Sequence, residues 1–280
     1  MNNGLISIAA LPDFEAHLRY EERSDATVSK YLHDVRTFFL FLADRRPEKQ
    51  EVMEYKAHLL EHYAVKSANS MIAALNVFLR FLGRHDLCVR QFRVQREAYC
   101  SEDRELTREE YFRLVEAAKR AKNERLMLIL QAICGTGIRV SELKYITVEA
   151  LRTGEAMVSC KGKNRRIFIV SALRKKLLAY AKHKRLESGP VFLSGRGRPM
   201  DRSAIWREMK ALCKSAGVEP AKVFPHNLRH LFARTFYGIE KDIAKLADIL
   251  GHASINTTRV YIITTGAEHK RKMEHMHLIC

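Results

Sequence analysis

The sequence has 280 residues, 47% of them hydrophobic, and this length suits two domains better than one. No apolar run is long enough to span a membrane, and the N-terminal segment lacks the basic region of a signal peptide. Six cysteines are scattered without a Cys-x-x-Cys pair, which indicates free thiols in a reducing compartment and no structural zinc site. We therefore expect a cytoplasmic protein.

The net charge of +17 is unevenly distributed along the chain. Residues 1–100 hold 14 basic and 13 acidic side chains, whereas residues 101–280 hold 35 basic and 19 acidic ones. A basic surplus confined to one part of a chain favours a polyanionic partner for that part, and nucleic acid is the commonest such partner. A basic protein without such a partner is the alternative that charge alone leaves open.

The first 98 residues are predicted to form an all-helical domain. Apolar residues recur at helical spacing in four segments, which predicts helices near 11–22, 24–42, 48–62 and 67–82. Ser24 and Asp25 offer an N-cap for the second helix, and Gly83 offers an end for the fourth. This part of the sequence contains no glycine-rich phosphate loop, metal cluster or repeat, so we expect a helical module without chemistry of its own.

Residues 84–105 are predicted to be a linker, because they contain five arginines and no long apolar run. The linker could lie along a phosphate backbone or be a solvated connector, and the sequence does not distinguish the two.

A second domain, residues 99–280, is predicted to combine helices with a small antiparallel sheet. Thr107 and Glu110 form a capping box that starts a helix, and a buried helix over 126–133 ends at the turn of 135–137. Short strands are predicted at 145–148, 156–160 and 166–170, and helices near 173–186 and 202–216. The loop GRGRP lacks the Lys-Ser/Thr of a nucleotide-binding loop, so ATP chemistry is unsupported.

Arg139 stands two residues after the turn of 135–137 and is predicted to open another helix, with Glu142 one turn on. Because helix N-termini favour anions, an arginine fixed there by a carboxylate would make a phosphate clamp. Lys161 stands at the tip of the predicted hairpin between the last two strands. A hairpin lysine can enter a groove, although most such residues are solvated turn residues.

The stretch 225–261 concentrates the polar residues of interest, His226, Arg229, His252 and Tyr261, among apolar residues at helical spacing. Gly251 marks the expected end of a helix. His226 and His230 lie four residues apart and could be metal ligands, but the glutamate expected between them in a zinc protease is missing. Each of these residues alone is a weak signal.

Together these residues suit the attack of a tyrosine on a DNA phosphodiester. Two arginines can hold the negative charge of the transferring phosphoryl group, and histidines can donate or shuttle protons. A lysine can protonate the departing 5′ oxygen. A phenol has an ordinary pKa of about 10, so its ionisation at pH 7 costs roughly 4 kcal/mol, which a pocket with two arginines could largely offset. Such a mechanism needs no divalent metal.

Four segments in this order, GTGIRVSEL, CKGKNRRIFIV, PHNLRH and LGHASINTTRVY, resemble the motifs of the tyrosine recombinases, the phage integrase and Xer-type family. The eight residues between the histidine and the tyrosine of the last segment also agree with the family spacing. The resemblance spans roughly residues 135–265. The helical N-terminal region resembles the SAM-like core-binding domain of the family more loosely, so the resemblance implies a DNA-clamping domain at 1–98 and a catalytic domain at 99–280.

By position, the resemblance assigns each conserved role to one residue of this sequence. Arg139 and Arg229 match the paired phosphate-binding arginines, and Glu142 matches the acidic residue that steadies the first arginine. Lys161 matches the hairpin lysine that acts as general acid, with Lys163 as the second choice. The remaining matches are the proton-transfer histidine, the histidine-or-tryptophan position and the nucleophile, namely His226, His252 and Tyr261. His230 is expected to be structural, and Leu231 departs mildly from the usual Ser or Thr.

The resemblance implies a site-specific recombinase that forms a covalent 3′-phosphotyrosine and needs neither ATP nor metal. The implied partners are double-stranded DNA with an inverted-repeat core site and three further copies of the chain in a tetrameric synapse. The sequence does not show whether an accessory protein or a partner recombinase is also required. The tail 262–280 would pack on its own domain or on a neighbouring protomer. Two rivals remain, a DNA-binding regulator that keeps the fold and a type IB-like topoisomerase, and the target DNA sequence is not readable.

Overall fold

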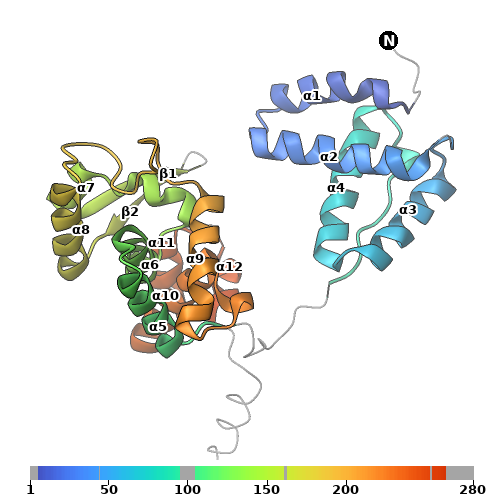
Figure 1. Ribbon diagram of the computed structural model, residues 1–280. Coiled ribbons are helices and arrows are strands. Elements are labelled where there is room, and N and C mark those ends of the chain that lie inside the picture. The colour runs from blue at the N-terminus through green and yellow to red at the C-terminus, as the bar shows by residue number, and fades with distance from the viewer. Residues whose placement is uncertain (1–5, 44, 95–104, 161–162, 253, 263–280) are drawn as a thin grey trace, which may run out of the picture. The chain divides into compact units, whose positions relative to one another are not determined.

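The computed structural model divides the chain into two compact units, Met1–Arg96 and Glu97–Cys280. It describes residues 6–43, 45–94, 105–160, 163–252 and 254–262 (Figure 1). Both units are built mainly from helices, and the second contains a two-stranded antiparallel sheet, so the predicted fold class is confirmed. Over the described ranges, no helix combines the length and apolarity that a membrane crossing requires.

The described part of the first unit forms four α-helices, α1 (Leu11–Tyr20), α2 (Asp25–Leu42), α3 (Lys49–His62) and α4 (Val65–Phe81), with short 3-10 helices η1 (Ile8–Ala10) and η2 (His85–Leu87). The hydroxyl of Ser24 caps α2 by accepting a hydrogen bond from the N–H of Thr27. The apolar faces of the helices meet in one core, where the rings of Phe14 and Phe78 lie edge to face, 5.1 Å apart between centroids.

The prediction of a linker from residue 84 onward was wrong for its first part. Two asparagine side chains of α4 hydrogen-bond to the backbone that follows η2. Each amide donates to the carbonyl of one residue and accepts from the N–H of the same residue, as the backbone of a neighbouring β-strand would. Asn76 donates to the carbonyl of Val89 at 2.8 Å and accepts from its N–H at 3.0 Å, and Asn69 pairs with Phe92 in the same way at 2.9 and 2.7 Å. Leu87 is buried in the core of the unit. Helical periodicity ends at Gly83, but side-chain amides of α4 continue the fold to Phe92.

The second unit contains helices α5 (Arg108–Arg120), α6 (Glu124–Thr136), η4 (Val140–Tyr145), α7 (Val148–Thr153), α8 (Ser171–His183), α9 (Arg202–Ala216), η5 (Pro220–Lys222), α10 (Pro225–Glu240), α11 (Ile243–Leu250) and α12 (Ile255–Ile262). The predicted capping box of α5 is present, with Thr107 and Glu110 exchanging hydrogen bonds. Gly137 ends α6 in the left-handed conformation.

The sheet of the second unit pairs β1 (Glu155–Cys160) with β2 (Lys163–Phe168), so that Val158 lies opposite Arg165 and Ala156 opposite Ile167. The predicted strand at 145–148 does not form. Thr147 instead caps α7 by accepting from the N–H of Ala150, and it makes a single β-bridge with Pro190. A run of apolar and β-branched residues predicted a strand, but the capping threonine started a helix there. The third predicted strand begins three residues earlier than expected.

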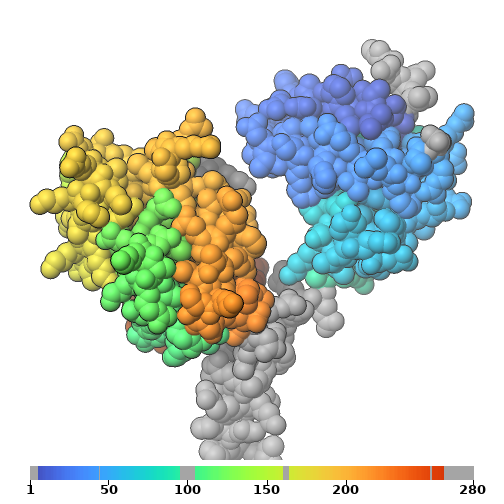
Figure 2. Space-filling view, in the orientation of Figure 1, coloured from blue at the N-terminus to red at the C-terminus, as the bar shows by residue number. Residues whose placement is uncertain are grey.

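One large core joins α5 to α10 around the sheet, and α9 packs against α5 and α6 (Figures 1 and 2). Helix α10 contributes Leu228 and Leu231 to this core. Its opposite side meets α11 and α12 in a smaller cluster built around Leu246, Leu250 and Tyr261. Helix α10 is therefore held on two sides, which fixes the directions of the polar residues in its first turns.

Candidate active site

The last three described helices bring the polar residues of 225–261 together. Pro225 occupies the first position of α10, where proline fits best, and His226 and Arg229 follow three residues apart on one face of the helix. Helix α11 ends at Gly251, whose φ of 63° is the left-handed conformation that glycine adopts readily. After His252 comes α12, which packs against α10 and α11 and carries Tyr261.

Arg229 lies at the centre of the site and is only 1% exposed. Its guanidinium donates to the backbone carbonyls of Gly137 and of Leu250, the latter at 2.7 Å, and to Nε2 of His252 at 3.0 Å. Burial lowers the pKa of Arg229 to about 10, and the charge of Arg139 acts in the same direction, so the group is still cationic at neutral pH.

Arg139 and Glu142 form the second part of the site, at the start of η4. The Glu142 carboxylate accepts from the backbone N–H of Arg139 at 3.0 Å and from its guanidinium at 2.8 Å. Burial alone would raise the pKa of Glu142. The hydrogen bonds from Arg139 and the charge of Arg165 outweigh burial and hold this pKa below its ordinary value. Glu142 is therefore ionised and keeps the Arg139 side chain in place, with 37% of that side chain exposed to solvent.

Arg165 of β2 joins the same network, and the sequence reasoning did not single it out. Its guanidinium forms an ion pair with Glu142 and donates to the carbonyl of Ile249 at 2.6 Å. The signal that could have found it is strand alternation. Arg165 shares the inner face of β2 with the buried Ile167, and a charge on that face must have a partner.

His252 is oriented by Thr258, a second residue that the sequence reasoning missed. The buried hydroxyl of Thr258 lies 2.9 Å from Nδ1 of His252, while Nε2 faces the guanidinium of Arg229. Since that guanidinium can only donate, Nε2 acts as acceptor and Nδ1 carries the hydrogen. Burial, together with the charges of Arg229 and Arg139, lowers the pKa of His252 to about 4, which agrees with this neutral tautomer.

Tyr261 lies over these groups and is 5% exposed. Its hydroxyl is 3.2 Å from Nε2 of His226, its ring stacks on His230 at a centroid distance of 4.1 Å, and Cζ of Arg229 lies 5.9 Å from the ring centroid. Burial and the charges of Arg229 and Arg139 keep the pKa of His226 below its ordinary value, so its imidazole is neutral at pH 7. A neutral ring nitrogen beside a phenol can accept the phenol proton.

The structure therefore brings together six of the seven residues singled out from the sequence, Arg139, Glu142, His226, Arg229, His252 and Tyr261. The seventh, Lys161, lies outside the described residues, between the end of β1 and the start of β2. The side chain of Lys163, the second choice, is likewise not described. The C-terminal tail 263–280 is also outside the described ranges.

Metal ligands were an alternative reading of His226 and His230, whose rings lie edge to face with centroids 4.8 Å apart. Within the described residues, no group of three or more His, Cys, Asp or Glu side chains is arranged to hold a metal ion. Burial lowers the pKa of His230 to about 4, so its imidazole is uncharged at pH 7 where it stacks on Tyr261.

Two family models match the chain, one in each structural unit. The model described as the phage integrase family matches residues 104–267, and the model described as phage integrase, N-terminal SAM-like domain, matches residues 11–86.

Relatives of known type are similar over nearly the whole chain. The sequence is 30% identical to tyrosine recombinase XerA of Thermococcus kodakarensis, with 94% of this chain and 93% of the relative covered. It is 28% identical to XerA of Pyrococcus furiosus, with 96% and 94% covered. Its fold is similar to that of a lambda integrase dimer bound to a COC′ core site, with a TM-score of 0.72, 19% identity, and 91% and 94% covered. Its fold is also similar to that of a lambda integrase tetramer bound to a Holliday junction, with a TM-score of 0.72 and 19% identity. This similarity covers 90% of this chain and 76% of the integrase chain.

Proposed function

The chain belongs to the phage integrase family, whose members are tyrosine recombinases that cut and rejoin DNA, and from this premise we propose that Tyr261 is its nucleophile. The protein acts in site-specific DNA recombination, and the family does so through a covalent phosphotyrosine. The observation that carries the assignment is the position of Tyr261, whose hydroxyl lies 3.2 Å from Nε2 of a neutral imidazole and whose ring centroid lies 5.9 Å from Cζ of the buried Arg229.

The proposed step is balanced without a further reactant. The phenol oxygen of Tyr261 attacks the phosphorus, and its proton passes to Nε2 of His226. A bond forms between this oxygen and phosphorus while the bond from phosphorus to the 5′ oxygen breaks. The 5′ oxygen takes a proton from the general acid, for which we propose Lys161 at the hairpin tip. The phosphodiester energy is kept in the tyrosine ester, so a 5′-hydroxyl can attack in turn and reseal a strand without ATP.

We assign the binding of the non-bridging phosphate oxygens to Arg139 and Arg229. The guanidinium groups of Arg139 and Arg165 share the single carboxylate of Glu142, and Arg229 adds a third positive charge to the site, so the site keeps a positive surplus that favours a phosphoryl group. Arg229 is nearly inaccessible in the free chain, and Tyr261 lies over it. A phosphate therefore reaches Arg229 only when the Tyr261 side chain moves aside, whereas Arg139 is already exposed enough to receive it. His252 would complete the set of donors once a bound phosphate offsets the cationic surroundings that now keep it neutral.

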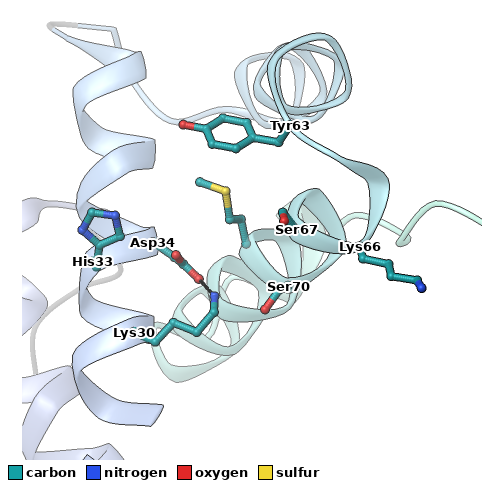
Figure 3. A pocket seen from close by; sticks show the side chains of 8 residues that line it. Lys30, His33, Asp34, Tyr63, Lys66, Ser67 and Ser70 are labelled. Atoms are coloured by element: carbon teal, nitrogen blue, oxygen red, sulfur yellow. Dashed lines mark hydrogen bonds and ion pairs between the residues drawn. The ribbon is translucent and has the colours of Figure 1, made fainter. Parts of the chain in front are cut away.

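We propose that residues 1–98 clamp DNA and that residues 99–280 carry the chemistry. A groove of about 440 Å³ in the first unit supports the clamping role (Figure 3). Its rim carries Lys30 and His33 of α2 and, from the first turns of α4, Lys66, Ser67 and Ser70. Asp34 faces the same groove but is neutralised by an ion pair with Lys30. The N-terminal end of α4 favours a phosphate group, because the helix dipole adds positive charge there.

The proposed partner is double-stranded DNA with an inverted-repeat core site, bound by two protomers, with four protomers joining two such sites. Two observations support this assembly, the similarity to a lambda integrase dimer on a core site and that to a lambda integrase tetramer on a Holliday junction. We also place the protein in the cytoplasm, where its DNA substrate is accessible and where the thiols of Cys88, Cys134 and Cys213, which are free in the structure, stay reduced.

Substitution of Tyr261 by Phe tests the proposal. The substrate is a DNA duplex selected from a random-sequence pool because it binds the full chain. A nick near the cleavage position prevents the cut strand from being resealed. We expect Tyr261→Phe to bind this duplex as the unaltered chain does but to give no covalent adduct on a denaturing gel. A covalent adduct that still forms with Tyr261→Phe would show that another residue is the nucleophile.

A further inference from the structure

Arg165 and Arg166 are adjacent in β2 but lie in opposite environments. Arg165 stands on the inner face of the strand, opposite the buried Val158, and its side chain is 11% exposed. Arg166 faces outward, with its side chain 58% exposed and paired to Glu155. An arginine on the inner face of a strand is costly unless its charge and its donors are satisfied. The groups that Arg165 contacts therefore indicate what its charge does in the site.

The β1–β2 hairpin is held in place by residues other than Arg165. Ala156 and Ile167 pair across the two strands and are buried in the core of the unit. The hydroxyl of Tyr145 donates to the carbonyl of Ser159 at 2.8 Å, which ties β1 to η4. Because these contacts hold the hairpin, the role of Arg165 has to be sought in the groups that its guanidinium binds.

Glu142 is the carboxylate that Arg165 shares with Arg139. One oxygen accepts from the guanidinium of Arg139 at 2.8 Å, and the other pairs with Arg165 and accepts from the backbone N–H of Arg139 at 3.0 Å. A single arginine beside this carboxylate would have its charge cancelled. With both arginines present the three groups keep one positive charge, and the Arg139 side chain, 37% exposed, stays available to a phosphate.

Three arginines bind three successive carbonyls at the end of α11. The pairs are Arg165 with Ile249, Arg229 with Leu250 and, at 3.4 Å, Arg139 with Gly251. The last carbonyls of a helix have no partner within it and carry the negative end of its dipole, so cations are favoured there. The side chain of Arg165 also packs on Gly251 so closely that a Cβ atom at that position would collide with it. The charge of Arg165 is therefore fixed at the same helix end as the phosphate-binding pair.

The charge of Arg165 also acts on the buried groups of the site. Burial and the charge of Arg139 lower the pKa of Arg229 to about 10, and the charge of Arg165 acts in the same direction. Burial and the charges of Arg229 and Arg139 lower the pKa of His252 to about 4, and Arg165 contributes to this shift as well. An anion placed among these groups would thus gain from the charge of Arg165 without touching its guanidinium.

We propose that Arg165 is a positioning residue for phosphate binding, because its positive charge offsets that of Glu142 and so leaves Arg139 available to the phosphate. This inference rests on the proposed function. Without Arg165, the buried carboxylate has Arg139 as its single guanidinium partner, holds that side chain more tightly and cancels its charge. The positive surplus that stabilises the transferring phosphoryl group then falls by one charge.

The test measures the rate of adduct formation on the selected, nicked duplex with single and double substitutions. We expect Arg165→Met to lower the rate roughly 100-fold, at the low end of the cost of removing one group that stabilises transition-state charge. In a chain that also carries Glu142→Gln there is no negative charge to offset, so Arg165→Met should lower the rate by less than roughly tenfold. Arg165→Lys keeps the charge and should stay within roughly tenfold of the unaltered chain.

The exposed ion pair of Glu155 and Arg166 in the same hairpin provides the matched control. Arg166→Met and Glu155→Gln make the same two changes on the outer face of the sheet. Exposed pairs are weakly coupled, so the effect of Arg166→Met should be the same with and without Glu155→Gln. For each variant, urea unfolding followed through Trp206 of α9 defines conditions in which the second unit is folded, and rates are compared only there.

A loss from Arg165→Met that is equally large in the chain carrying Glu142→Gln would overturn the inference, because it would show that Arg165 supports the fold or the end of α11 rather than the charge of the site. A loss with Arg165→Lys as large as that with Arg165→Met would overturn it as well, and so would an Arg165→Met rate equal to that of the unaltered chain. If the unaltered chain forms no adduct, the proposed function itself fails, and that outcome is distinct from the other three.

Discussion

Glu142→Gln should destabilise the second unit by a predictable amount. The carboxylate is 2% exposed and accepts from the Arg139 backbone and from the guanidinium groups of Arg139 and Arg165. A glutamine keeps one acceptor oxygen but turns an NH₂ group toward a guanidinium, so one charge-assisted hydrogen bond is lost and the others weaken. With about 1.5–3 kcal/mol per bond to a charged group, the free energy of unfolding should fall by roughly 3 kcal/mol at pH 7.

Urea unfolding of the full chain measures this change in the second unit specifically, because the single tryptophan of the sequence, Trp206, lies in α9. A loss of roughly 3 kcal/mol should move the midpoint down by about 1–1.5 M urea. Glu155→Gln is the matched control. It removes the carboxylate of the exposed ion pair between Glu155 of β1 and Arg166 of β2. Such exposed pairs contribute at most about 1 kcal/mol to the free energy of unfolding.

The difference between the unaltered chain and Glu142→Gln should also depend on pH. The folded state holds the pKa of Glu142 below its ordinary value of 4.5. The carboxylate therefore contributes its full stabilisation above about pH 4.5, and this contribution is lost as the pH falls toward the lower pKa of the folded state. The difference should be the same at pH 7 and pH 6 and should shrink below pH 4.5. A difference at pH 7 no larger than that of Glu155→Gln would refute the reasoning.

Chelation with EDTA should leave adduct formation unchanged, since Arg139 and Arg229 supply the positive charge that a metal would otherwise provide; a loss that added Mg²⁺ restores would contradict this. Gly251→Ala should lower the free energy of unfolding by about 1–2 kcal/mol through left-handed backbone strain and, by displacing Arg165, reduce cleavage at least roughly tenfold. Gly217→Ala is its control, because φ there is 59° with no atom near the added Cβ, so it should show the strain alone.

Periodicity and turn residues predicted most of the helices because these signals are local. Thr107 with Glu110, Ser24 and Gly251 each mark a helix boundary through a hydrogen bond or a backbone conformation that involves only neighbouring residues. The strand predicted at 145–148 does not form, and a local signal explains this as well. A short apolar run is ambiguous by itself, and the capping hydroxyl of Thr147 decided it in favour of a helix.

Contacts between distant segments were less predictable. The resemblance to a family pointed to Arg139, Arg229 and Tyr261, but not to Arg165 or Thr258, whose partners lie on other elements. The predicted strand began only at residue 166, so alternation was not applied to Arg165; β2 begins at Lys163 and puts Arg165 on the inner face, but alternation alone does not say which carboxylate meets it. Likewise, nothing local marks Asn69 and Asn76 of α4 as the residues that hold the segment after η2.

The arginine contacts at the end of α11 also bear on when the protein becomes able to break DNA. Arg139 reaches a carbonyl 112 residues further along the chain, and Arg229 joins carbonyls on both sides of itself in sequence. While the chain is being synthesised, the guanidinium groups lack these acceptors until the residues through Gly251 have emerged, and the phenol follows later still. A product that ends before Gly251 would thus lack the backbone acceptors that hold these guanidinium groups, and it would lack Tyr261, the proposed nucleophile.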